Sequence, residues 1–238
     1  MPQPTSGGPG IRGRPGKFWT RRGESPRSYG TFFRSDCLTL LADRRVAYGD
    51  GGADSGNIAR LLLLDHGGKR LEIANTHLKW DPPETARERK VGYRQILQAI
   101  EALRPEASSS DGQIVCGDLN SAPESDVIEA LLADGFDYAH RLCPSARTCN
   151  SNHQPRLIDH LLYRGSLRAH PISPAEVDAE TPLPSAEKPS DHVPLTAEFD
   201  WAEDIALFSL FSAGSPGSPS DSATRFFSLP KHLIPLLF

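Results

Sequence analysis

The sequence lacks long apolar runs and is poor in cysteine. Of its 238 residues 38% are hydrophobic, but no stretch approaches the roughly 20 consecutive apolar residues of a membrane-spanning helix. The first 30 residues also lack the apolar segment of a secretory signal peptide. The four cysteines include no C-x-x-C pair, which argues against a zinc ribbon and against a disulfide scaffold. We therefore expect no membrane insertion and a reducing, cytoplasmic location.

Basic residues are scarce outside the N-terminal part of the chain. Residues 1–34 contain seven Lys/Arg and one acid, whereas the rest holds 19 bases and 29 acids, a net charge of −10. An acidic body argues against a protein that coats nucleic acid by charge alone. It is compatible with a carboxylate-lined site that holds a divalent cation and thereby offsets the charge of a phosphate substrate.

Composition divides the chain into three parts. Residues 1–27 are rich in Gly, Pro and Arg and predict a disordered basic leader, either a solvated tail or an arm that touches nucleic acid. Residues 28–200 carry the regular apolar patterns of one folded domain. Residues 201–238 include a Ser/Gly/Pro linker and predict a poorly ordered tail, for which a docking segment and a non-native extension both remain open.

Strand and helix patterns alternate along the folded domain, which is typical of an α/β or α+β protein. An amphipathic helix is predicted after two prolines, and a short helix with acidic residues at its start follows the next strand. Five prolines in residues 171–189 predict a loop. The predicted strands are 31–34, 38–41, 58–64, 70–77, 113–118, 157–163 and 193–199, and the predicted helices are 84–103 and 125–133.

Polar residues stand at the ends of four predicted apolar strands. A single Asp or His in such a place is most often a cap or a satisfied polar group. Four together are different, because strands of one sheet bring their ends to a common edge, where sites form. The candidate site residues are His77, Asp118, Asn120, Asp159, Asp191 and His192.

The chemistry of this set points to phosphate-ester hydrolysis assisted by a metal ion. The carboxylates can bind a cation, orient an imidazole or activate water, and the histidines can transfer protons near neutral pH. The amide of Asn120 can donate to a phosphate without adding charge. Oxygen ligands beside histidines favour Mg²⁺, with Mn²⁺ as the alternative, over zinc.

Four motifs in a fixed order carry a resemblance to a known family. Residues 74–78 read ANTHL, residues 117–123 read GDLNSAP, residues 158–160 read IDH and residues 189–195 read PSDHVPL. Together they resemble the endonuclease/exonuclease/phosphatase superfamily over roughly residues 28–200. Residues 31–41 are similar to a strand of its nocturnin and deadenylase-like branch.

The resemblance implies a deoxyribonuclease I-like fold, a four-layer sandwich of two mixed β-sheets flanked by helices. It implies that Asp118 orients or deprotonates the attacking water and that Asn120 binds the scissile phosphate. It further implies that His192 pairs with Asp159, that Asp191 serves as the metal ligand, and that His77 contacts the substrate and stabilises the transition state. The reaction of the family is an in-line attack of water on phosphorus, with Mg²⁺ polarising a phosphoryl oxygen.

One departure from the family pattern bears on activity. The family has an Asn on its first strand and a metal-binding Glu, usually after Gln, and neither motif precedes the residues quoted above. Glu24 is the only acid before residue 36 and follows no strand pattern. We therefore expect the N-terminal part of the domain to be missing from this chain.

The predicted function is a Mg²⁺-dependent phosphoesterase. We expect a monomeric phosphodiesterase or nuclease that acts on RNA, DNA or a nucleotide, with endo- and exonucleolytic cleavage both open. One alternative is a catalytically inactive fragment that serves as an interaction module. Another is a phosphatase of lipid or inositol phosphates. The absence of the Glu motif favours the inactive fragment, whereas the six candidate residues favour the enzyme.

Overall fold

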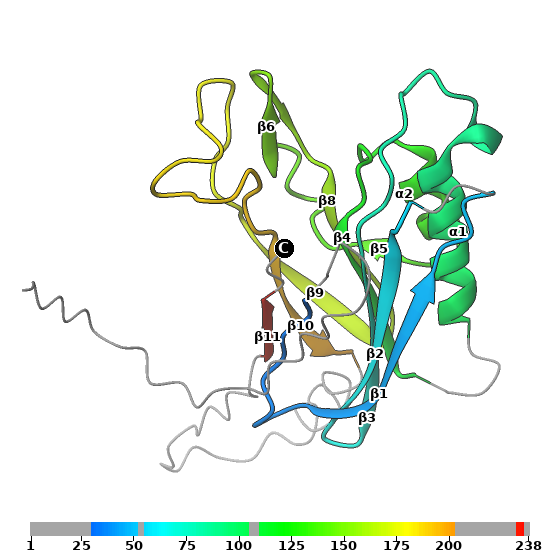
Figure 1. Cartoon of the computed structure of the whole chain (residues 1–238). Coiled ribbons are helices and arrows are strands. Elements are labelled where there is room, and N and C mark those ends of the chain that lie inside the picture. Colours follow the sequence, from blue (N-terminus) through cyan, green and yellow to red (C-terminus); the bar gives the residue numbers. More distant parts are fainter. Residues whose placement is uncertain (1–29, 52–54, 105–109, 203–231, 236–238) are drawn as a thin grey trace, which may run out of the picture.

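A six-stranded mixed sheet forms the centre of the molecule (Figure 1). The structure is a computed structural model of the chain, and it describes residues 30–51, 55–104, 110–202 and the backbone of 232–235. The strand order is β1-β2-β3-β4-β8-β5, with only β3 and β4 parallel. Its strands are β1 (Thr39–Ala47), β2 (Ile58–His66), β3 (Lys69–Thr76), β4 (Gly112–Asp118), β5 (Asp137–Tyr138) and β8 (Asp159–Gly165).

Adjacent residues of the central strands enter two different cores, because successive side chains of a strand point to opposite faces. Leu61 of β2 and Val115 of β4 face the two helices, whereas Leu62 and Ile114 beside them face the second sheet. Burial on both faces explains why these strands read as continuous apolar runs and show little alternation.

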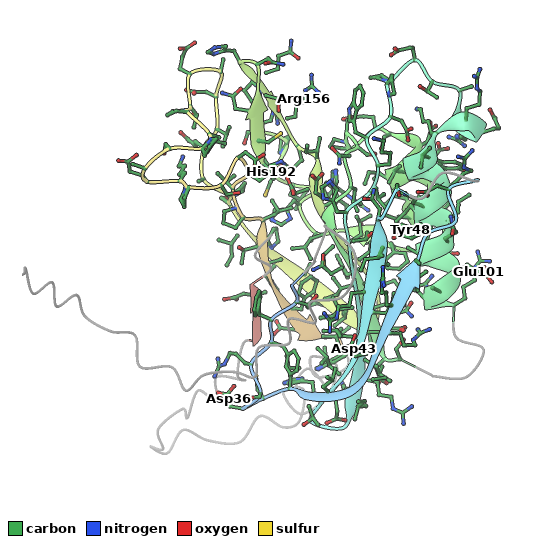
Figure 2. All side chains as sticks on the ribbon, in the orientation of Figure 1. Asp36, Asp43, Tyr48, Glu101, Arg156 and His192 are labelled. Carbon is green, nitrogen blue, oxygen red and sulfur yellow. The ribbon has the colours of Figure 1, made fainter. Side chains whose placement is uncertain are left out.

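Two helices cover one face of this sheet and pack against each other. Helix α1 (Val91–Leu103) buries Ile96, Ile100 and Leu103, and Figure 2 shows Glu101 on the outer side of the same helix. Helix α2 (Asp126–Ala133) begins after Ser125, whose side chain accepts a hydrogen bond from the backbone of Ile128. The predicted short helix is therefore confirmed.

The long helix begins later than the sequence pattern predicts. A 3₁₀ turn (η1, Arg87–Arg89) precedes it, and Lys90 has an extended backbone, so residues 84–90 are not α-helical. The N-terminus of α1 is capped from outside the helix. Asp81 accepts hydrogen bonds from the backbone of Val91 and Gly92 at 3.1 and 2.7 Å, which satisfies two of the free N–H groups.

A smaller antiparallel sheet covers the other face of the central sheet. Its strands are β9 (Leu167–Ile172), β10 (Thr196–Trp201) and β11 (His232–Pro235), in the order β11-β10-β9. The sequence patterns predict neither β9 nor β11, and β11 lies within the predicted tail. A two-stranded hairpin, β6 (Cys149–Ser151) and β7 (Gln154–Arg156), projects beside the site.

The described residues thus form two packed sheets with helices on the central sheet, which is the arrangement that the resemblance implies. Only the central sheet is mixed, and in the described part of the chain no helix covers the outer face of the smaller sheet. Residues 31–34 form no strand, in contrast to the prediction. The predicted leader, Glu24 and most of the predicted tail lie outside the described residues. None of the described helices is long and apolar enough to cross a membrane.

Candidate active site

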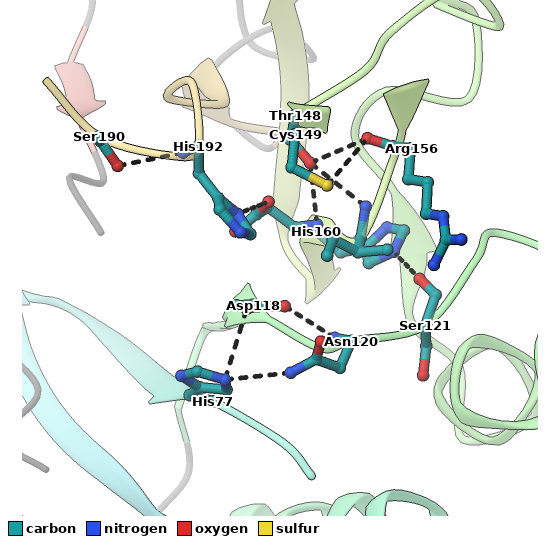
Figure 3. Close-up of polar contacts among 12 residues, drawn as sticks. His77, Asp118, Asn120, Ser121, Thr148, Cys149, Arg156, His160, Ser190 and His192 are labelled. Atoms are coloured by element: carbon teal, nitrogen blue, oxygen red, sulfur yellow. Dashed lines mark hydrogen bonds and ion pairs between the residues drawn. The ribbon is translucent and has the colours of Figure 1, made fainter. Parts of the chain in front are cut away.

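Polar residues at the ends of four strands lie close together (Figure 3). Strands β3 and β4 are parallel, so His77, just after β3, and Asp118, the last residue of β4, lie at the same end. Strand β8 runs antiparallel to β4, and its first residue, Asp159, therefore pairs with Asp118. The residue His192 precedes β10 and is bridged to Cys149 of the hairpin.

Gly117 permits the close approach of β3 and β4 at this edge. Its φ is +133°, and a Cβ at this position would lie 1.8 Å from the carbonyl oxygen of Thr76. A side chain is therefore excluded by the backbone of the neighbouring strand. The glycine before Asp118 is thus a steric requirement of the site.

Asn120 joins the ends of β3 and β4. Its Nδ2 donates to Nε2 of His77 at 3.0 Å and to the carbonyl of Leu78 at 2.9 Å, and its backbone N–H donates to Oδ1 of Asp118 at 2.9 Å. The ring nitrogen Nε2 of His77 also lies 3.4 Å from Oδ2 of Asp118. The two hydrogens of the amide nitrogen are therefore engaged within the chain.

Asp159 and His192 form a short ion pair. Oδ2 of Asp159 accepts from Nδ1 of His192 at 2.6 Å. This hydrogen bond and the negative charge of Asp159 raise the pKa of His192 to about 9, against the effect of burial. Thr148 supports the pair, because its hydroxyl accepts from the backbone N–H groups of Ile158 and Asp159. The imidazole is therefore protonated at neutral pH and held by its Nδ1.

The pKa of Asp118 is unusually high for a carboxyl group. Burial, followed by the nearby charge of Asp159, raises its pKa to about 7. The facing carboxylate of Asp159 is 1% exposed, and its Oδ1 has no hydrogen-bond partner. Ligand atoms of Asp118, Asp159 and His192 lie within 4.8 Å of one another.

The structure brings five of the six candidate residues into contact through two linked groups. His77, Asp118 and Asn120 form the first group, and Asp159 with His192 forms the second. Asp191 is exposed and is not one of the clustered ligand residues, although its charge acts on both Asp118 and His192.

Sequence reasoning missed three supporting residues. Thr148 and His160 are 0% exposed, and Tyr138 donates to the ring of His160. Of these three residues, only His160 is recognisable from the sequence, because it follows Asp159 in the IDH motif. Thr148 and Tyr138 lie in segments without a recognisable pattern, and their partners are distant in the sequence.

Comparison with known proteins places the chain, with this constellation on two packed sheets, in a family. The sequence model of the Endonuclease/Exonuclease/phosphatase family matches residues 13–192, which is more than half of the chain. The chain therefore belongs to that family.

Two relatives are exoribonuclease subunits of fungi. The CCR4-Not complex 3'-5'-exoribonuclease subunit Ccr4 of Candida albicans is 24% identical over an alignment of length 227, and the match covers 71% of this chain and 29% of that protein. The same subunit of Mycosarcoma maydis is 25% identical over 200 residues, 60% of this chain and 30% of that protein. The match thus spans less than a third of these relatives.

Solved structures of similar fold include a nocturnin domain and a 2',3'-cyclic phosphatase. The human Nocturnin catalytic domain with bound sulfate superposes with a TM-score of 0.58 at 22% identity, covering 78% of this chain and 72% of that one. ANGEL2, a 2',3'-cyclic phosphatase in complex with adenosine-2',3'-vanadate, gives 0.62 at 17% identity, with 78% and 74% covered. These identities support the fold alone.

Proposed function

We propose that this chain is a metal-dependent phosphodiesterase that cleaves RNA, DNA or a nucleotide by in-line attack of water. Family membership supports hydrolysis of a phosphate ester, and the two Ccr4 relatives favour RNA. The observation that carries the proposal is the pair of facing carboxylates of Asp118 and Asp159 with a protonated His192 beside them. This arrangement provides a base and an acid within one site.

The carboxylates fit a divalent cation. A buried carboxylate oxygen without a donor, Oδ1 of Asp159, lies beside the partly buried carboxylate of Asp118. Burial and then the charge of Asp159 raise the pKa of Asp118. Asp118 and Asp159 would hold the ion, with exposed Asp191 next to them, and hard oxygen donors suit Mg²⁺ or Mn²⁺. When bound, such an ion polarises a phosphoryl oxygen as a Lewis acid.

The chain's own residues then divide the proton transfers. Asp118 accepts a proton from the attacking water; its pKa of about 7 holds for the metal-free site, and a bound cation would lower it. His192 keeps its proton on Nε2, the side away from Asp159. It donates a hydrogen bond to a phosphate oxygen and passes the proton to the leaving oxygen as the old P–O bond breaks. His77, held by the amide of Asn120, lies on the opposite side, where it orients the phosphate.

The test is hydrolysis by the purified 238-residue chain. The substrates are a short oligo(A) RNA, the matching DNA, an RNA ending in a 2',3'-cyclic phosphate, and bis(p-nitrophenyl) phosphate. Activity with Mg²⁺ should vanish in EDTA and fall by about 10²–10⁴-fold in His192→Ala and Asp118→Asn. His170→Ala, which removes an exposed histidine paired with Asp200, is the matched control and should retain full activity.

The outcomes separate the alternatives. Cleavage of the RNA with little cleavage of the DNA supports the ribonuclease assignment. Action on the cyclic phosphate alone points to the chemistry named for ANGEL2. A folded chain that hydrolyses none of these substrates refutes the enzyme and supports the interaction module.

A further inference from the structure

His160 is a fully buried titratable group beside the site, and the proposed reaction does not use it. It follows Asp159 in β8, it is 0% exposed, and both ring nitrogens have partners. Nε2 lies 2.7 Å from the carbonyl oxygen of Ser121, and Nδ1 lies 3.1 Å from the hydroxyl of Tyr138. A carbonyl only accepts, so Nε2 carries the hydrogen and the hydroxyl of Tyr138 donates to Nδ1.

The carbonyl that His160 holds belongs to the residue directly after Asn120. Asn120 has a φ of +48°, a left-handed conformation that is uncommon outside glycine and that Asn adopts more readily than most residues. On one side of this turn the Asn120 side chain is bonded to His77 and Leu78. On the other side the bond from His160 to Ser121 fixes the chain (Figure 3).

We propose that His160 is a positioning residue that holds Asn120 against His77 through the carbonyl of Ser121, with Tyr138 setting the imidazole tautomer. The inference deepens the proposed function and rests on it for the kinetic readout. His160 touches no substrate, because it is enclosed by the core side of β8. Its contribution to turnover therefore passes through Asn120.

The kinetic test is a double-mutant cycle with the proposed substrates. His160→Leu removes the donor to Ser121 and should lower kcat about 10- to 100-fold, whereas His160→Gln keeps a donating N–H and should recover to within about threefold of the wild type. In the Asn120→Ala background, His160→Leu should add no further loss. Equal, additive losses in both backgrounds would refute action through Asn120.

A second readout does not depend on activity. In His160→Leu, the backbone amide of Asn120, which donates to Asp118, should exchange its hydrogen about tenfold faster relative to the amide of Val115 in β4. His140→Leu is the matched control, because His140 is also buried but bonds the carbonyl of Thr196. It should leave both kcat and the relative exchange at Asn120 unchanged.

The two readouts distinguish failure of this inference from failure of the proposed function. If the wild type hydrolyses nothing and the exchange at Asn120 still rises in His160→Leu, only the function is refuted. If the exchange at Asn120 does not change relative to Val115, the positioning role is refuted, whatever the activity.

Discussion

Two histidines on opposite sides of Asp159 have pKa values that are shifted in opposite directions. On the solvent side, His192 donates to the carboxylate and has a pKa raised to about 9. On the core side, burial lowers the pKa of His160 to about 4, although a carbonyl accepts from its ring. An imidazole that faces a carboxylate is protonated. A buried imidazole that contacts only neutral groups stays neutral and still donates a hydrogen bond.

The two histidines therefore have different roles: His192 takes part in the proposed reaction, and His160 supports the structure of the site. The charged imidazole lies where a phosphate would need a donor, and the neutral imidazole lies where a backbone turn needs a rigid neighbour. A charge on the core side would be costly, because burial disfavours the ionised form. The strand end therefore presents one reactive side and one structural side.

The largest expected effect comes from removing the charge that separates the two sides. Asp159→Asn should lower the pKa of His192 from about 9 toward its usual value near 6.5. It should also reduce the rate of hydrolysis by about 10²–10⁴-fold, because the imidazole then loses its proton at neutral pH. An NMR titration of the metal-free protein reports the pKa, and the substrates named above report the rate.

A matched variant controls for the loss of a carboxylate beside a histidine. Asp200→Asn removes the partner of His170, an exposed pair 2.9 Å apart, and should leave the rate unchanged. If His192 still titrated near pH 9 in Asp159→Asn, the origin of its charge would have to be sought in Asp118 and Asp191.

The core side predicts acid lability. His160 has a pKa of about 4 in the folded protein and near 6.5 when unfolded, so between these values the unfolded state binds the extra proton. The stability that the neutral ring provides is complete above pH 6.5 and is lost as the pH falls toward 4. The wild type should lose about 3 kcal/mol more than His160→Gln over this range.

Urea unfolding at pH 7, 6, 5 and 4 measures this difference. Comparison of the two proteins cancels the contributions of carboxylates elsewhere in the chain, provided that they are not coupled to residue 160. Parallel pH profiles for the wild type and His160→Gln would show that the buried imidazole is not the acid-sensitive group.

The sequence predicts much of the fold and of the reactive side. The apolar runs of residues 58–64, 113–118 and 157–163 correspond to the central strands β2, β4 and β8. These strands are buried on both faces, so the sequence shows them as continuous apolar stretches. The residues His77, Asp118, Asp159 and His192 were found because polar groups at the ends of such runs have no simple packing role.

The supporting side could not be predicted in this way. The bonds of His160 to Ser121 and Tyr138 span 39 and 22 residues, so only the folded chain reveals the pairing. The beginning of α1 was misplaced because its cap, Asp81, lies ten residues before Val91. Strands β9 and β11 were missed because their sequences contain proline and histidine, which weaken a strand pattern.

A smaller effect should appear at Asp118 in the absence of metal. Its folded pKa of about 7 lies above the usual value, so the cost of its ionisation is complete above pH 7 and is relieved as the pH falls toward 4. At pH 8 in EDTA, Asp118→Asn should therefore raise the unfolding free energy by about 1–3 kcal/mol, even though it lowers the activity with Mg²⁺ by about 10²–10⁴-fold. Thermal and urea unfolding measure the gain.

Addition of Mg²⁺ gives a second test of the repulsion between Asp118 and Asp159. The cation should stabilise the wild type, whose two carboxylates repel each other, and should have little effect on Asp118→Asn. Asp126→Asn is the control, because Asp126 pairs with Arg87 and Lys90 and its loss should lower stability slightly. A destabilised Asp118→Asn protein in EDTA would contradict the proposed repulsion at the site.

The smallest effect is expected for Asp191, the predicted metal ligand that lies outside the clustered carboxylates. Its side chain is exposed, so water screens its charge, and it acts on Asp118 and His192 from the rim. Asp191→Asn should raise the Mg²⁺ concentration for half-maximal hydrolysis about threefold and leave kcat at saturating Mg²⁺ within about twofold. A Mg²⁺ titration of the rate decides the point. A loss as large as that of Asp159→Asn would make Asp191 a direct ligand and shift the metal toward the solvent side of the site.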